Sequence, residues 1–232
     1  MRKVIFLLAT FVLLMGTQSF AQKKVQFGVK GGLNLSKISQ SNLGDATQKL
    51  NPGYAFGGLF EFNASKVLAL ESGLFLSSKG TKLETTASES GVSITGKYIV
   101  SPLYVELPVN LVYKLAVGTS TLRLFLGSYF AVGVGGTMKD KYSATGLPAG
   151  VTLASLGLDD SSTDITFGSS DDSDLARIDG GYIIGAGYQM KDLIISAQYG
   201  LGTFNLDPSG SSDNESKNRV IGISVGYLFG GK

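Results

Sequence analysis

Hydrophobic and polar residues alternate along the stretch from Pro102 to Leu115. Every second residue is apolar, and we call these positions the apolar parity of the stretch. They are Leu103, Val105, Leu107, Val109, Leu111 and Tyr113. A period of two places these side chains on one face of a β-strand and the residues between them on the other face. The pattern lasts for about 12 residues, and a tilted strand needs about 9–11 residues to cross a bilayer. The stretch is therefore predicted to be a transmembrane strand.

Seven further segments alternate in the same way, so the sequence predicts eight strands. Their expected ranges, with the first stretch included, are 25–36, 53–63, 67–79, 102–115, 121–135, 177–190, 193–204 and 220–229. After the first 21 residues, no segment keeps the 3.6-residue period of an amphipathic helix. The predicted fold class is all-β, an eight-stranded antiparallel up-and-down transmembrane β-barrel.

The connections between the predicted strands alternate strictly between short and long. The long ones cover residues 37–52, 80–100, 136–176 and 206–218. Bacterial outer-membrane barrels combine short periplasmic turns, longer external loops and an even number of strands. The same arrangement is predicted here, with the four long connections outside the cell.

Charged residues inside the predicted strands all fall on the parity opposite the apolar one. They are Lys30, Glu61, Glu71, Lys79, Glu106, Lys114, Arg123, Arg177 and Asp179. Two arrangements fit this pattern: a soluble barrel with its apolar parity inside, or a membrane barrel with that parity facing lipid. The many glycines on the charged parity and the aromatic residues near strand ends favour the lipid-facing barrel.

In a lipid-facing barrel the nine charged residues would line the interior as a charge cluster. Eight strands enclose a space that side chains just fill, and an unpaired buried ion costs several kcal/mol. We therefore expect a structural network of ion pairs. The functional alternative is a gated polar pathway or a ligand site.

The first 21 residues have the features of a secretory signal peptide. Arg2 and Lys3 precede an apolar run, and Ser19-Phe20-Ala21 is an acceptable cleavage site. The apolar run has 12 residues, whereas a membrane-spanning helix needs about 20. We expect cleavage after Ala21, which would leave residues 22–232 as a single barrel domain.

Composition narrows the possible chemistry. The chain has 20 Lys and Arg against 18 Asp and Glu, so without the two bases of the signal peptide it is nearly neutral, and nucleic acid is not expected as a partner. It contains no Cys and no His, the residues of thiolate metal sites and of most general bases. No catalytic residue, metal site or cofactor is predicted. Six Asp residues lie within residues 159–174, where a solvated loop is expected and a Ca²⁺ site is left open.

Four stretches resemble the PorT-type outer-membrane β-barrel family that is common in Bacteroidota. They are Lys24–Ser36, Tyr104–Leu115, Asp179–Met190 and Asn218–Phe229. The resemblance implies the barrel fold and an outer-membrane location, and it brings no catalytic residue with it. The family takes its name from a member implicated in protein secretion. One departure is the sequence Gly230-Gly231-Lys232 after Phe229, because outer-membrane insertion signals usually end on the aromatic residue.

Together these features predict a non-enzymatic protein with a structural or binding role at the cell envelope. The expected partners are outer-membrane lipids and, during biogenesis, the barrel-assembly machinery. An envelope protein or an external ligand could bind the four long connections. The alternatives are a small pore or transporter for solutes and, less favoured because His is absent, an outer-membrane hydrolase or acyltransferase.

Overall fold

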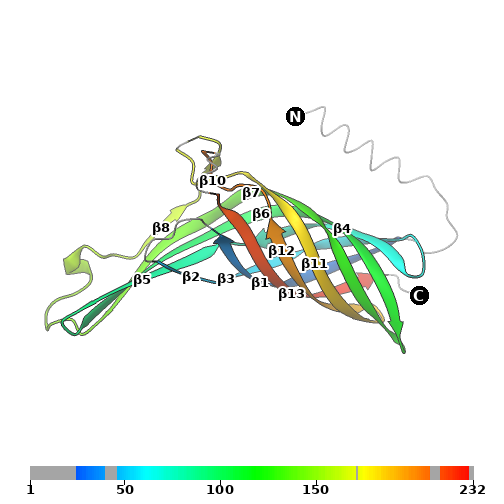
Figure 1. The fold of residues 1–232 in the computed structure, drawn as a ribbon, viewed down its shortest axis with the longest axis horizontal. Helices are drawn as coiled ribbons and strands as arrows, with labels where there is room; N and C mark the ends of the chain where they lie inside the picture. The colour runs from blue at the N-terminus through cyan, green and yellow to red at the C-terminus, as the bar shows by residue number, and fades with distance from the viewer. Residues whose placement is uncertain (1–24, 40–45, 171, 210–214, 230–232) are drawn as a thin grey trace.

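A computed structural model describes residues 25–39, 46–170, 172–209 and 215–229. The predicted signal peptide and its cleavage site lie outside these residues. Eight long strands form the body of the molecule (Figure 1). They are β1 (Val25–Ser39), β3 (Asn51–Asn63), β4 (Leu68–Ser78), β6 (Val92–Val117), β7 (Ser120–Thr145), β11 (Ile178–Met190), β12 (Leu193–Gly202) and β13 (Lys217–Phe229).

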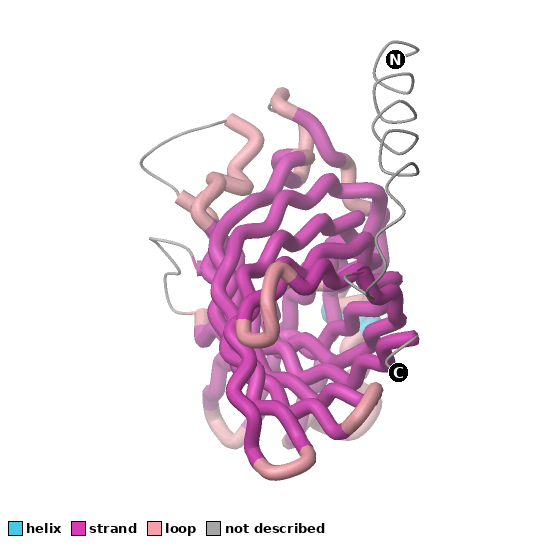
Figure 2. The backbone as a smooth tube through the Cα atoms, turned by 90° about the vertical axis from the view of Figure 1, so that its right-hand side faces the viewer, coloured by secondary structure: helices cyan, strands magenta, loops and turns pink. Residues whose placement is uncertain are grey.

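The eight strands form a closed antiparallel ring. Each strand pairs with its neighbour in the order β1-β3-β4-β6-β7-β11-β12-β13, and the last strand pairs with the first. Figure 2 shows the strands curving around a common interior. The predicted fold class is therefore confirmed. No helix in the described part of the chain is long and apolar enough to cross a membrane.

The two parities of each strand separate into an outer and an inner surface. On β6, Leu107 and Leu111 are exposed, whereas Glu106 and Asn110 are buried. Directly opposed residues in neighbouring strands share a face, so the apolar parity of one strand continues into the next. The exposed parity forms an apolar outer band, and the charged parity lines the interior.

The short turns lie together at one end of the ring. They connect β3 to β4, β6 to β7 and β11 to β12. In the turn after β6, Gly118 has a φ of 60°, a left-handed conformation that glycine adopts without steric cost. The long connections lie at the opposite end, in agreement with the predicted alternation.

Parts of the expected loops form further strands. Residues 80–100 hold β5 (Thr81–Glu89) and the outer part of β6, and β7 continues to Thr145. With β2 (Thr47–Lys49) and β8 (Ser161–Asp164), they form a five-stranded sheet in the order β2-β5-β6-β7-β8. We call it the extension sheet: residues 47–49, 81–101, 136–145 and 161–164. It projects beyond the barrel at the end opposite the short turns (Figure 1).

The sequence did not reveal the extension sheet because the apolar residues of β6 change faces: Leu103 lies on the outward parity, whereas Tyr98 and Val100 lie on the other one. Alternation marks a strand when one face meets an apolar environment and the other a polar one. Beyond the barrel the outward residues of β6, such as Thr95 and Lys97, are polar, so the outward apolar row of the barrel stops there. Other boundaries move less: β1 continues to Ser39, β3 begins at Asn51, β12 ends at Gly202 and β13 begins at Lys217.

The connection between β7 and β11 contains little regular structure. Besides β8 it holds a 3₁₀ turn, η2 (Ala154–Leu156), and a two-stranded parallel pair of β9 (Phe167–Gly168) and β10 (Leu175–Ala176). The amide of Ala176 donates a hydrogen bond to the carbonyl oxygen of Leu206, which ties this connection to the one after β12.

Candidate functional site

Five of the predicted interior charges meet near the short-turn end of the barrel, and we call them the turn-side cluster. Arg123 Nη2 contacts Glu71 Oε2 at 2.8 Å and also pairs with Glu61. Lys114 Nζ lies 2.5 Å from the other Glu61 oxygen, and Lys30 Nζ lies 2.5 Å from the other Glu71 oxygen. Each carboxylate therefore lies between two cations.

The turn-side cluster depends on register across several strands. Glu61 and Glu71 are directly opposed on β3 and β4, and Lys114 and Arg123 are directly opposed on β6 and β7. Like charges that face each other across a ladder repel. The two acids and the two bases therefore stabilise each other by forming ion pairs across the lumen. Arg123 is 1 % exposed, and its guanidinium also donates a hydrogen bond to Gln189 Oε1 at 2.9 Å.

Three more of the predicted charges meet near the long-loop end, and we call them the loop-side cluster. Lys79 Nζ lies 2.5 Å from Glu106 Oε2 and 3.1 Å from Asp179 Oδ2. The fully buried Asp179 also accepts hydrogen bonds from the Tyr129 hydroxyl at 3.2 Å and from Asn218 Nδ2 at 2.9 Å. The ammonium of Lys79 lies 4.0 Å from the centre of the Tyr129 ring, close enough for a cation–π contact.

The two clusters balance each other in formal charge. The turn-side cluster has three bases and two acids, and the loop-side cluster has one base and two acids. The eight groups are thus neutral overall. Such balance matters inside a barrel, because breaking a buried pair leaves an uncompensated charge.

Arg177 is the one predicted interior charge that joins neither cluster. It lies just before β11, and its Nη2 donates a hydrogen bond to the carbonyl oxygen of Phe167 at 3.0 Å. The predicted strand range that began at residue 177 is therefore one residue too long. Arg177 holds β9 near the barrel mouth instead of pairing with an acid in the lumen.

Apolar side chains from the long connections close the loop-side end of the barrel. Ile165, Phe167 and Leu206 are buried, and the Phe167 ring contacts the Tyr104 ring edge-on at a centroid distance of 5.8 Å. A Cβ at Gly133 would lie 2.4 Å from the Phe167 ring, so only glycine accommodates this cap. The cap was not predicted from the sequence, where its only signal is isolated apolar residues within an Asp- and Ser-rich stretch.

A small cavity with a mixed polar and apolar lining lies in the lumen between the two clusters. Its volume is about 40 Å³, and its lining includes Lys30, Asn34, Glu106, Asn110 and Gln198. One water molecule needs roughly 10–15 Å³ measured in this way. The space therefore fits a few water molecules and is too small for a solute of metabolite size.

Two acidic residues of the connection between β7 and β11 accept hydrogen bonds from backbone N–H groups. Asp160 Oδ1 accepts the backbone N–H of Tyr142 at 3.0 Å, and Asp174 Oδ2 accepts that of Thr166 at 2.7 Å. Among the described residues, which leave out Asp171, no three acidic side chains are grouped so that they could hold a metal ion.

The outer surface of the ring carries large exposed apolar side chains on every strand. Representative ones are Leu33, Leu107, Leu126, Ile184 and Ile223. In water this surface would be unstable, whereas a closed barrel with an apolar outer band satisfies all its backbone hydrogen bonds within lipid. The fold and its two surfaces therefore define a membrane-spanning β-barrel.

The chain belongs to the family described as the outer membrane protein beta-barrel domain, whose profile matches residues 18–208. It is accordingly an integral protein of the outer membrane. No curated protein matches the chain.

Solved structures of small outer-membrane proteins are similar to this chain. Ail, the attachment invasion locus protein of Yersinia pestis, is 15% identical, with a TM-score of 0.39, and the match covers 89% of this chain and 99% of that one. Neisserial surface protein A is 12% identical, with a TM-score of 0.42 and coverages of 88% and 97%. The outer membrane protein OprG from Pseudomonas aeruginosa is 12% identical, with a TM-score of 0.38 and coverages of 88% and 95%.

Proposed function

We propose that this protein is a non-enzymatic envelope protein whose closed barrel anchors an extracellular binding surface. The surface consists of the extension sheet and the long connections. Two features support the proposal: the lumen is filled by ion pairs and capped, and the chain contains no His to serve as a general base. An envelope protein or an external ligand would bind outside the membrane.

The length of β6 and β7 is the observation that carries this proposal. Each strand has 26 residues, which corresponds to about 85 Å at 3.3 Å per residue. A transmembrane strand needs only about 9–11 residues. More than half of each strand therefore lies outside the bilayer, and its pairing with β5 and β8 makes a sheet rather than a mobile loop.

Labelling of single cysteines tests the orientation, because the natural chain contains no Cys. Ala87→Cys places a thiol near the tip of the extension sheet, and Ala64→Cys places one in the β3–β4 turn. Both positions are exposed. A membrane-impermeant maleimide should label the cysteine at 87 in intact cells. It should label the one at 64 only after the outer membrane is permeabilised, and the reverse pattern would contradict the proposal.

A small solute pore is the second candidate function, and conductance separates it from the closed barrel. Purified protein in a planar bilayer should give no stable stepwise currents, because the described residues fill the lumen with the two clusters and the cap and leave between them a cavity of only about 40 Å³. A porin inserted in the same membrane serves as the positive control. Reproducible current steps from the wild-type protein would favour the pore.

The narrower assignment to the PorT-type group is also part of our proposal. It is supported by the four stretches that resemble that group, which fall on β1, β6, β11 and β13 of the ring. A role in envelope assembly or secretion would follow from that membership. Residues 1–21 would then direct export and be removed, as the sequence suggests.

A further inference from the structure

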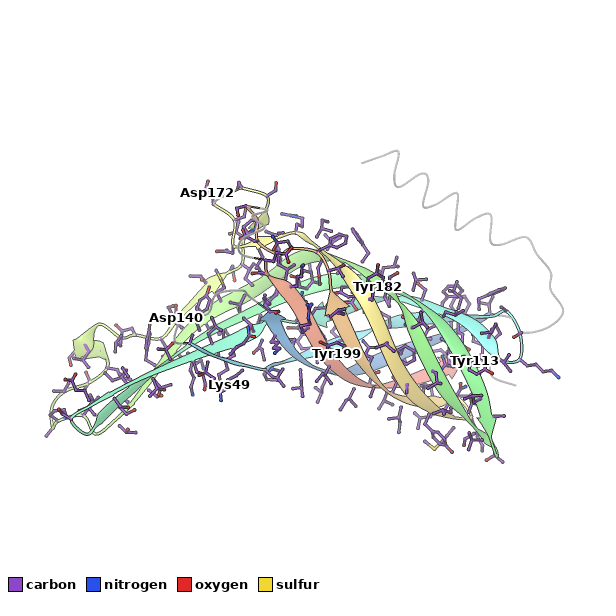
Figure 3. The ribbon with its side chains drawn as sticks, viewed as in Figure 1. Lys49, Tyr113, Asp140, Asp172, Tyr182 and Tyr199 are labelled. Carbon is purple, nitrogen blue, oxygen red and sulfur yellow. The ribbon has the colours of Figure 1, made fainter. Side chains whose placement is uncertain are left out.

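Five lysines lie on one face of the extension sheet, and we call this the lysine face. They are Lys49, Lys82, Lys97, Lys139 and Lys141. Across β2, β5, β6 and β7, the register places Lys49 opposite Lys82, Lys82 opposite Ile99, and Ile99 opposite Lys139. Two residues further along β6 and β7, Lys97 stands opposite Lys141. Opposed residues share a face, and so do residues two apart in a strand. Figure 3 labels Lys49 on this face and Asp140 on the opposite face.

A β-bulge in β7 decides the direction of two of these lysines. Tyr104 stands opposite Gly133 and Leu103 opposite Gly135, so Val134 is an extra residue in the ladder. An extra residue reverses the parity of the strand beyond it. Lys139 and Lys141 would otherwise have the inward parity of Arg123, and the bulge turns them outward.

The lysine face has a large excess of positive charge. The carboxylates on it are Glu84, which lies 2.7 Å from Lys82 Nζ, and Asp164, opposite Thr137. The hydrogen bond from Lys82, and then the charges of Lys82, Lys97 and Lys49, lower the pKa of the Glu84 carboxyl. The opposite face holds Asp140 and Glu89 and no lysine.

Most of these lysines have no anion of their own. Within the described part of the chain, the ammonium groups of Lys49, Lys97, Lys139 and Lys141 form no ion pair. Like charges on adjacent strands repel. Such a face is stabilised when an external anion occupies it.

The lysine face continues the lipid-facing surface of the barrel. On β6, Leu103, Ile99 and Lys97 share the outward parity. Ile99, with Lys82 and Lys139 beside it, is four residues beyond Leu103, which corresponds to a height of about 10 Å for a strand tilted by 35–45°. The headgroup layer is about 5–8 Å thick on each side of the hydrocarbon, and lysine side chains extend their charge toward it along a long apolar stem.

Other bases occupy the same level of the barrel wall. Lys37 on β1 stands opposite Arg219 on β13, and both have the outward parity just beyond the apolar residues Leu35 and Ile221. Basic groups therefore gather above the apolar band on a second part of the ring. This distribution fits a flat anionic layer better than a single soluble ligand.

We propose that the lysine face binds the phosphate groups of outer-leaflet lipid headgroups and holds the extension sheet against the membrane surface. The inference rests on the proposed extracellular orientation of that sheet. It adds a specific partner, a phosphate-bearing lipid such as lipid A, to the proposed binding surface.

Two neighbouring labels test the contact in nanodiscs that contain the full mature chain. Ile99→Cys puts a nitroxide on the lysine face, and Tyr98→Cys puts the same label on the opposite face. For each nitroxide, the rate of collision is measured with a nickel chelate carried on a lipid headgroup and with a nickel chelate dissolved in water. In nanodiscs with lipid A, the label at 99 should collide with the headgroup chelate more often than the label at 98.

The neutralised variant Lys97→Gln/Lys139→Gln/Lys141→Gln should lose this difference between the two labels. The two labelled proteins with all their lysines should also lose it in 1 M salt, where the Debye length is about 3 Å. Phosphatidylcholine nanodiscs should show a smaller difference. Equal collision rates at both positions in lipid A nanodiscs would overturn the proposal.

A soluble polyanion is the competing partner and has its own arm of the test. Dextran sulfate or inorganic phosphate is added to phosphatidylcholine nanodiscs, and collisions with the water-soluble chelate are measured. Shielding of the label at 99 by these anions, without any effect of lipid A, would also overturn the proposal. The maleimide experiment on Ala87→Cys reports the orientation separately, so failure of the proposed function and failure of this inference are distinguishable.

Discussion

Replacing Arg123 with methionine is expected to lower the free energy of unfolding by about 3–5 kcal/mol, the usual cost of breaking a buried ion pair from one side. The substitution leaves the carboxylates of Glu61 and Glu71 each with one lysine in place of two cations. Both carboxylates are buried, so water cannot replace the lost partner. Urea unfolding of the barrel in phospholipid vesicles measures the effect.

Two controls make the Arg123 experiment specific. Lys82→Met removes one partner of a half-exposed pair on the extension sheet and should change the unfolding midpoint little, because surface pairs contribute little. The combined variant Lys30→Met/Glu61→Gln/Glu71→Gln/Lys114→Met/Arg123→Met removes all five charges of the turn-side cluster, leaves no unpaired ion there and should recover much of the loss. Equal midpoints for Arg123→Met and Lys82→Met would contradict a structural role of the turn-side cluster.

Replacing Leu107 with arginine is expected to destabilise the inserted barrel by about 2–4 kcal/mol, the range for a charge on the lipid face at the bilayer midplane. Leu107 is 45% exposed and lies in the middle of the outward apolar residues of β6. Its new guanidinium would have to leave water for acyl chains. Folding yield and unfolding midpoint in liposomes measure the cost.

The same strand offers a matched control for Leu107→Arg. Thr95 has the same outward parity on β6 but belongs to the extension sheet, opposite Thr86 and Ser143. Thr95→Arg should therefore be nearly neutral, since its charge stays in water or near headgroups. If both variants fold equally well in liposomes, the apolar outer band does not face lipid.

The clusters and the cap together explain why this barrel has a filled interior. Eight strands leave little more room than their own side chains occupy, and here ion pairs use that room at two levels. The hydrophobic cap adds a third closure at the long-loop end. A molecule closed in this way interacts with its surroundings through its outer wall and through the extension sheet and long connections, which we propose to be extracellular.

The sequence predicted most of the barrel because the bilayer imposes a simple rule on every strand. The alternation at Leu103 to Tyr113 and its counterparts located all eight strands of the ring, and the alternating loop lengths gave their order and direction. The nine charged residues were selected by parity alone. Parity cannot say which acid meets which base, since that depends on the register of strands far apart in the chain.

Three features lay beyond the sequence argument for definite physical reasons. In the extension sheet the apolar residues of β6, such as Tyr98 and Val100, lie on the opposite parity from those of the barrel, so the barrel pattern does not continue into it. Phe167 reaches the barrel mouth only through long-range folding of an irregular connection, over the space left by Gly133. The extra residue Val134 in β7 is visible only as a mismatch between two paired strands.

The sequence by itself determined the all-β class, the eight spanning strands and the separation of apolar and charged parities. These properties follow from local periodicity, which a one-dimensional pattern contains in full. Only the tertiary structure decided the partners of Arg123 and Asp179, the closure of the lumen and the outward direction of Lys139 and Lys141. These depend on register, bulges and loop packing, which bring together residues that no local pattern connects.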